Sequence, residues 1–170
     1  AITMAAAKLA ASKGQPKRSI RVVLFAAEEF GLWGAKAYVK AHEKSLTNIV
    51  AAAESDFGAD RIWGFESKVD ASALPVVRDI AQMMKSLNVE YIGKNAARGG
   101  PDLIPFRAFN IPEFALKQDG TDYFNYHHTA DDTLDKIDPA KLRQNVATYA
   151  VFAYMAANAK TRIIGKQVKK

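Results

Sequence analysis

Two adjacent glutamates, Glu28 and Glu29, follow an apolar run over residues 22–25 after two alanines. A third acid, Asp56, follows a second apolar run over residues 49–53. Continuous apolar runs of this kind predict strands that are buried on both faces. Carboxylates are rarely buried unless they are paired or bind a metal. Since sites in open α/β sheets form at the carboxyl ends of strands, we expect these acids to converge at one edge of a sheet.

The segment NYHHTADDT places His127, His128, Asp131 and Asp132 in a polar loop before the last predicted helix. Carboxylate and imidazole groups, in a chain without cysteine, are the donors typical of a catalytic rather than a structural zinc site. A hydrolytic site also needs a base that is not a ligand. Because consecutive residues leaving a strand point in opposite directions, one of the adjacent glutamates can face a metal while its neighbour faces the attacking water.

Each of these motifs also has a common structural interpretation. Adjacent glutamates before a helix are most often first-turn acids that the helix dipole stabilises. Asp56 can accept backbone hydrogen bonds in a turn. A lone histidine such as His128 is more often structural than a ligand, and Thr129 and Asp131 suit a loop or a cap. The joint placement of the motifs after strands favours the metal-binding interpretation.

Helices and strands alternate along the predicted chain. Helices are expected at residues 1–13, 31–43, 74–87 and 139–159, strands at 20–26, 49–53, 61–66 and 112–116, and a glycine-rich loop at 93–101. The last helix has Asp138 as its cap and Pro139 at its first position. This alternation, without repeats or a dividing linker, favours one α/β sheet with helices on both faces.

Size and charge narrow the class of protein. A chain of 170 residues that is 49% hydrophobic can form one globular domain, and no apolar run approaches the ~20 residues of a membrane helix. The 24 basic and 18 acidic residues give a net charge of +6, of which the last eleven residues supply +5. We interpret residues 161–170 as a solvated basic tail and expect no nucleic-acid or membrane partner. The absence of cysteine excludes disulfides and thiolate metal sites.

Four motifs resemble the di-zinc aminopeptidase family, which includes bacterial leucyl aminopeptidase and the glutamate carboxypeptidases. They are FAAEEFGLWGAKAYV, AAAESDFGA, GGPDLIPF and YHHTADDTLDKID, and the last two are most similar to the carboxypeptidase Q branch. The resemblance covers residues 1–159. It implies a three-layer α/β sandwich with a mixed, mostly parallel sheet, in which residues 1–160 form the carboxyl-terminal part of the catalytic domain. Because residue 1 falls within a helical pattern that has no cap, we expect the amino-terminal portion of the fold to precede this chain.

The resemblance assigns roles to four residues in the motifs. Glu28 matches the general base that takes a proton from the attacking water. Glu29 and His128 match the ligands of one zinc ion, and Asp56 matches a ligand of the second. The three carboxylates would then lie close together, and this should raise the pKa of at least one of them.

Three other positions follow from the same resemblance. Asp102 falls where family members line the substrate pocket, and Asp132 matches an acid that orients the loop or an imidazole behind the ligands. His127 matches a neighbour that is not a ligand. The family's remaining histidine and bridging aspartate belong to a segment before residue 1. We therefore expect weak or no zinc binding and no peptidase activity in the isolated chain.

For the longer protein, the resemblance implies a zinc-dependent exopeptidase that removes a terminal residue from a peptide or splits a dipeptide. It also favours a secreted or periplasmic location. A sheet edge left bare by absent strands could drive self-association. Two alternatives share the fold: a receptor-like ectodomain without catalysis, and a single-zinc transferase similar to glutaminyl cyclase.

Overall fold

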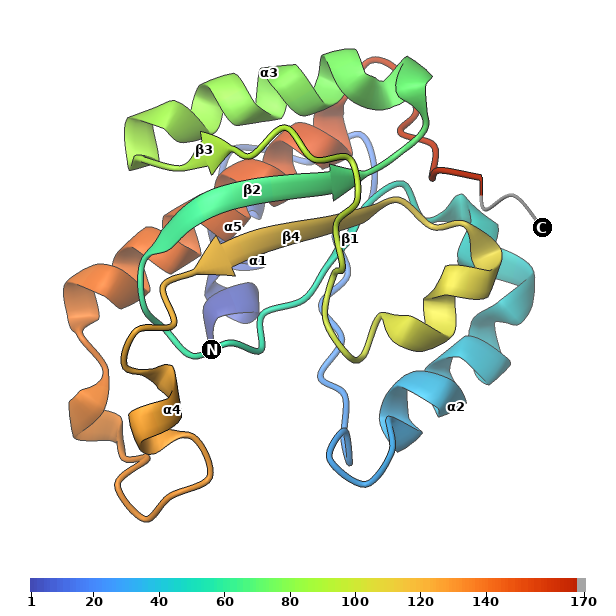
Figure 1. Cartoon of the computed structure of the whole chain (residues 1–170). Helices are drawn as coiled ribbons and strands as arrows, with labels where there is room; N and C mark the ends of the chain where they lie inside the picture. The colour runs from blue at the N-terminus through green and yellow to red at the C-terminus, as the bar shows by residue number, and fades with distance from the viewer. Residues whose placement is uncertain (168–170) are drawn as a thin grey trace.

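A computed structural model describes residues 1–167, and these form a four-stranded mixed sheet flanked by helices (Figure 1). The helices are α1 (Ile2–Ala11), α2 (Trp33–His42), α3 (Leu74–Met84), α4 (Tyr123–Tyr126) and α5 (Pro139–Asn158). The strands are β1 (Ala52–Ala53), β2 (Ile62–Lys68), β3 (Glu90–Tyr91) and β4 (Glu113–Gln118). Short 3₁₀ helices include η1 (Glu43–Asn48), η3 (Lys85–Leu87) and η4 (Ile104–Phe109).

The strand order is β1-β4-β2-β3. The β1–β4 and β2–β3 pairs are parallel, whereas the longer β2–β4 pair is antiparallel. In the antiparallel register Lys68 lies opposite Glu113, and their side chains form an ion pair of 2.8 Å. Opposite charges on facing strand residues stabilise this register. The mixed, mostly parallel sheet expected from the sequence is therefore confirmed.

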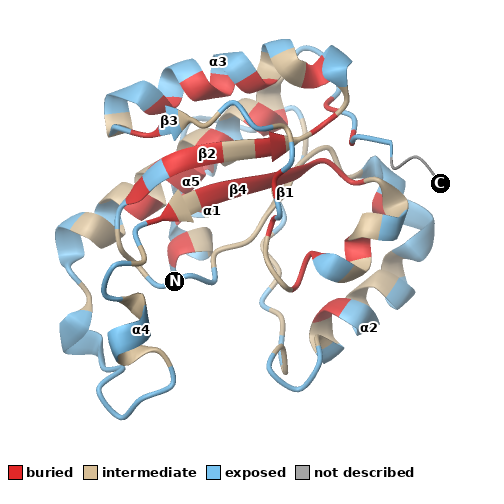
Figure 2. Cartoon of the chain, in the orientation of Figure 1, coloured by how far each residue is buried: buried red, intermediate tan, exposed pale blue. Residues whose placement is uncertain are grey.

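The main core lies between one face of β2 and β4 and the helices α1, α3 and α5 (Figure 2). Phe65 and Phe114 stack in parallel, with ring centroids 5.7 Å apart, and Phe152 of α5 packs on Phe114 at 5.0 Å. A second, smaller core joins α2, η1 and η4 around Leu46 and Phe106. The first core holds the sheet together, and the second holds the segment that carries Glu28 and Glu29.

The strand predicted at residues 20–26 is not present. This segment is irregular chain and pairs with no strand among residues 1–167. The side chain of Leu24 is 69% exposed rather than buried on both faces. A groove of about 920 Å³ lies along residues 18–25 and 48–56. Residues 22–25 have a strand-forming sequence, but no strand of the described structure lies beside them in this groove.

The other predicted elements are confirmed with adjusted ends. The second predicted strand forms only at Ala52–Ala53, since β4 is its single neighbour. The predicted helix over residues 74–87 ends as the 3₁₀ turn η3. Asp138 caps α5 as expected, because its side chain accepts hydrogen bonds from the backbone N–H groups of Ala140 and Lys141.

The first part of the predicted basic tail is packed rather than solvated. Ile163 is buried in the main core, and the N–H of Asp70 donates to the carbonyl of Ile164 at 2.8 Å. A Cβ atom on Gly165 would lie 1.7 Å from the carbonyl oxygen of Asn110, so only glycine fits there. Residues 168–170 lie outside the described part of the chain. No helix within residues 1–167 combines the length and the hydropathy needed to cross a membrane.

Candidate metal centre

Glu28 and Glu29 lie in a tight turn between the irregular segment and α2. The N–H groups of Gly31 and Leu32 both donate to the carbonyl of Glu28 at 2.9 Å. Leu32 and Ala27 adopt left-handed backbone conformations, with φ angles of 61° and 57°. Left-handed non-glycine residues cost energy and cluster at functional sites, where the surrounding structure holds them. The turn thus presents both carboxylates ahead of the helix.

The interpretation of these glutamates as first-turn acids is wrong. α2 begins at Trp33, and its first turn contains no acid. Its start is instead fixed by close packing, since a Cβ on Gly34 would lie 2.7 Å from the backbone of Ala26. The two glutamates therefore need another partner than the dipole of α2.

Asp56 follows β1 after two intervening residues. Among the hydrogen bonds of residues 1–167, none ends on the carboxylate of Asp56, so the turn-acceptor interpretation finds no support. The strand end is instead anchored through the backbone, because the Tyr149 hydroxyl of α5 donates to the carbonyl of Glu54. Asp56 is left with an unengaged carboxylate at the edge of the sheet.

The histidine segment leaves α4 and reaches the glutamate turn. The Nε2 atom of His128 lies 2.8 Å from Oε1 of Glu29, a contact between residues 99 positions apart. His128 has a left-handed φ of 59°, and its imidazole stacks on that of His127 with centroids 3.8 Å apart. Thr129 forms the expected turn, because its hydroxyl donates to the carbonyl of Tyr126. Turn chemistry and convergence on Glu29 are thus both present in this segment.

One carboxylate and two imidazoles form a group with the donor chemistry of a zinc site. The ligand atoms of Glu29, His127 and His128 all lie within 4.8 Å of one another. The family resemblance identifies His127 as a neighbour of the ligand and not as a ligand itself, yet the backbone brings its ring into the same group. No local pattern distinguishes the two histidines, because their placement depends on the left-handed backbone of His128 itself. The donors present fit a divalent transition metal.

Burial and nearby negative charges raise the pKa of two acids of the site, Glu28 and Asp56. Partial burial raises the pKa of Glu28, and the charges of Glu29, Asp56 and Asp102 raise it further, against an opposing effect of His128. Burial and the charge of Glu29 also raise the pKa of Asp56. The pKa increase expected from crowded like charges is confirmed in direction. The charges of Asp56 and Asp102 act on the pKa of Glu28, so acids from separate motifs lie close enough to interact.

Two acids with buried carboxylate oxygens, the buried Asp102 and the half-buried Glu54, lie behind this site. Asp102 is 7% exposed, and both its Oδ1 and the Oε2 of Glu54 are buried without a hydrogen-bond partner among residues 1–167. Burial, followed by the charges of Asp56 and Asp102, raises the pKa of Glu54 to about 8. The backbone is shaped around this carboxylate, since a Cβ on Gly100 would lie 2.4 Å from Oε2 of Glu54. Glu54 is not among the residues that the motifs predict to have a role, and its position two residues before Asp56 is the one local signal that points to it.

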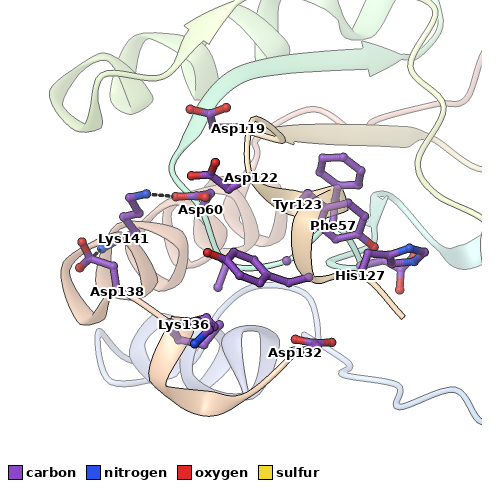
Figure 3. Close-up of a pocket in the computed structure, with 15 residues that line it drawn as sticks. Phe57, Asp60, Asp119, Asp122, Tyr123, His127, Asp132, Lys136, Asp138 and Lys141 are labelled. Carbon is purple, nitrogen blue, oxygen red and sulfur yellow. Dashed lines mark hydrogen bonds and ion pairs between the residues drawn. The ribbon is translucent and has the colours of Figure 1, made fainter. Parts of the chain in front are cut away.

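Two cavities meet at Asp56. The smaller, of about 230 Å³, is lined by Asp56, His127 and Asp132 together with aromatic rings (Figure 3). The larger is the groove of about 920 Å³ beside residues 18–25, and it is lined by Asp56, Glu54 and Asp102. Asp132 and Asp102 therefore belong to different cavities on either side of the candidate ligand.

The chain belongs to peptidase family M28, because the model of that family matches residues 1–153. It is 29% identical over 144 residues to carboxypeptidase Q of Mus musculus, which covers 85% of this chain and 30% of the relative. Carboxypeptidase Q of Homo sapiens is 28% identical over the same shares. The chain thus spans about 30% of the length of these relatives. The resemblance found in the motifs is confirmed.

Solved structures agree on the fold. A Peptidase M28 precursor from Shewanella amazonensis SB2B superposes with a TM-score of 0.88 at 45% identity, over 97% of this chain and 39% of that one. LapA from Legionella superposes with a TM-score of 0.63 at 21% identity, over 86% of this chain and 42% of that one. The second match shows the fold alone.

Proposed function

We propose that the longer protein containing this chain is a zinc-dependent exopeptidase of the aminopeptidase or dipeptidase type, acting on peptides. The observation that carries the proposal is the 2.8 Å contact of His128 with Glu29, which joins two motifs 99 residues apart. Membership of peptidase family M28 supports the same conclusion. A secreted or periplasmic location of that protein stays a prediction from the family resemblance.

Two zinc ions would share the ligands of this chain with ligands from the rest of the protein. Glu29 and His128 would hold one ion, and Asp56 would hold the other. A histidine and a bridging aspartate from outside this sequence would complete the pair. Bound zinc would polarise the scissile carbonyl and acidify the attacking water.

Glu28 would act as the general base of the reaction. It is adjacent to Glu29 but is not needed as a ligand, and its raised pKa brings it closer to the range of an effective proton acceptor. It would take a proton from the attacking water and deliver it to the leaving amine. Asp102 would line the substrate groove, and Asp132 would support the histidine segment from the smaller cavity.

Substitution of each glutamate in the longer protein tests this division of labour. Glu28→Gln should keep the metal but lose activity by about 10²–10⁴-fold, because proton transfer is removed while the shape is kept. Glu29→Gln should instead lower zinc content, measured by atomic absorption. Glu43→Gln, at an exposed position in η1, is the matched control. Equal metal loss in Glu28→Gln and Glu29→Gln would overturn the assignment.

Zinc stoichiometry gives a second test. The longer protein should bind two zinc ions, whereas a single ion would favour the transferase alternative. The isolated chain should bind zinc weakly or not at all and should not hydrolyse amino-acid amides or dipeptides. Chelator-sensitive turnover by the isolated chain would mean that it already contains a complete site.

The open groove beside β1 also supports the predicted self-association. In the described structure β1 is an edge strand, and the neighbouring residues 20–25 make no backbone–backbone hydrogen bond. Such edges promote pairing between chains. Sedimentation velocity across a concentration series should therefore show reversible association of the isolated chain. A concentration-independent monomer would contradict it.

A further inference from the structure

Four aromatic rings form a continuous stack, here called the aromatic column, that runs from Phe57 to His128. The ring centroids of Phe57 and Tyr123 are 4.0 Å apart, with an interplanar angle of 23°. Tyr123 and His127 follow at 4.8 Å and 32°, and His127 and His128 at 3.8 Å and 18°. Figure 3 shows Phe57, Tyr123 and His127 next to one another at the smaller cavity. The column thus begins one residue after Asp56 and ends at the partner of Glu29.

The aromatic column is the main attachment of the histidine segment. Residues 121–136 are attached to parts of the chain distant in sequence at two places within residues 1–167, counting hydrogen bonds, ion pairs and ring contacts. The first is the ring contact with Phe57, and the second is the contact of His128 with Glu29. The remaining contacts of this segment are local turns. Without the column, the imidazoles would be held by the Glu29 contact alone.

Two glycines make room for the aromatic column. A Cβ atom on Gly120 would lie 2.5 Å from Cε1 of Phe57, closer than real Cβ contacts allow. A Cβ on Gly58 would lie 3.2 Å from the ring of Tyr123, at a left-handed φ of 69°. The backbone on both sides is therefore shaped to the rings. Phe57 remains 38% exposed, so its stacking is not explained by burial in a core.

We propose that Phe57 and Tyr123 are positioning residues, which hold the imidazoles of His127 and His128 at a fixed distance from Glu29 and Asp56. The proposal rests on the proposed zinc site. Offset and stacked aromatic pairs prefer defined separations and angles, so a column of them restricts rotation of each ring. Because Phe57 directly follows Asp56, the column also couples the candidate ligands of the two ions.

Histidine NMR of the metal-free chain tests the column directly. The chain has three histidines, and His42, whose ring packs on Tyr38 at 4.3 Å, provides an internal reference. In the wild type, the ring protons of His127 should show ring-current shifts and nuclear Overhauser contacts to Tyr123. Phe57→Leu and Tyr123→Leu should move the His127 and His128 signals toward free values and leave His42 unchanged. Tyr123→Phe keeps the ring and should preserve the spectrum.

Zinc titration of the longer protein supplies a second readout. Phe57→Leu should weaken zinc binding by about fivefold to tenfold, the effect of losing one stacked pair, and Tyr123→Leu, which removes two pairs of the column, should weaken it further. Trp63→Leu is the matched control, because Trp63 is a 52% exposed aromatic on β2 that makes no ring contact within the described chain. The control should keep wild-type affinity.

The outcomes separate the two proposals. Unchanged His127 and His128 signals in a folded Phe57→Leu chain, judged by an unchanged His42 signal, would overturn the positioning role. Wild-type zinc affinity in that variant would overturn it as well. Absence of zinc at Glu29 and His128 in the wild-type longer protein would instead overturn the proposed function, while the histidine spectrum would still decide the positioning role.

Discussion

Two segments that the sequence predicts as strands have different structures, although the one that forms no strand is the more apolar of the two. Residues 113–118 form β4, which pairs with β1 on one side and β2 on the other and is buried along almost its whole length. Residues 22–26 form no strand and lie half-buried or exposed. The difference lies in the neighbours rather than in the residues. An apolar run predicts a strand only where another strand is available to satisfy its backbone.

The largest contrast between the two regions should appear on truncation of one apolar side chain in each. Phe114→Ala should lower the free energy of unfolding by about 3–5 kcal/mol, because Phe114 is fully buried between Phe65 and Phe152. Leu24→Ala should change it by less than about 0.5 kcal/mol, as exposed positions do. Urea unfolding of the isolated chain measures both. Similar losses would show that the 22–26 segment is as well packed as β4.

A smaller change in stability should come from Glu54, which lines the groove between the paired strand β1 and the unpaired segment. Its pKa is raised from 4.5 to about 8 in the folded state, so the folded chain holds a proton that the unfolded chain has released. The stability that this proton contributes is present below about pH 4.5 and is lost as the pH rises through about 8. Glu54→Gln should therefore match the wild type near pH 5 and be more stable above pH 8.

Urea unfolding at a series of pH values, with a chelator present, measures this difference. The exposed Glu43 provides the control, since Glu43→Gln should leave the pH dependence unchanged. Parallel stability curves for Glu54→Gln and the wild type would contradict the assignment of the buried proton to Glu54.

The smallest effect should distinguish the two helix starts of the carboxyl-terminal half. Asp138→Ala should lower the unfolding temperature by a few degrees, because the side chain caps α5 through two backbone N–H groups. Asp122 has the equivalent position before α4 but makes no capping hydrogen bond within the described residues 1–167. Asp122→Ala should therefore have little effect. Circular dichroism melts compare the two variants, and equal shifts would exclude capping as the cause.

Local patterns predicted the elements whose determinants lie within a few residues. The cap at Asp138, the start of α5 and the strands β2 and β4 follow from such patterns and are confirmed. The failure at residues 20–26 is non-local, since strand pairing depends on a neighbour that the run itself does not encode. The same holds for His127, whose ring enters the metal group through a left-handed residue next to it. The burial of the Glu54 carboxylate depends on Gly100, in a loop distant in sequence, so no local pattern predicts it.

The packing of α1 on α5 has a consequence for folding during synthesis on the ribosome. Ile2, Ala6 and Ala10 of α1 are buried chiefly by α5, which begins only at Pro139. Synthesis runs from the amino terminus at about 5–20 residues per second, so the apolar face of α1 stays exposed for several seconds until α5 has been synthesised. Apolar surface exposed during that interval is prone to aggregation. Contacts between elements so distant in sequence also slow folding, because a long loop must close before they form.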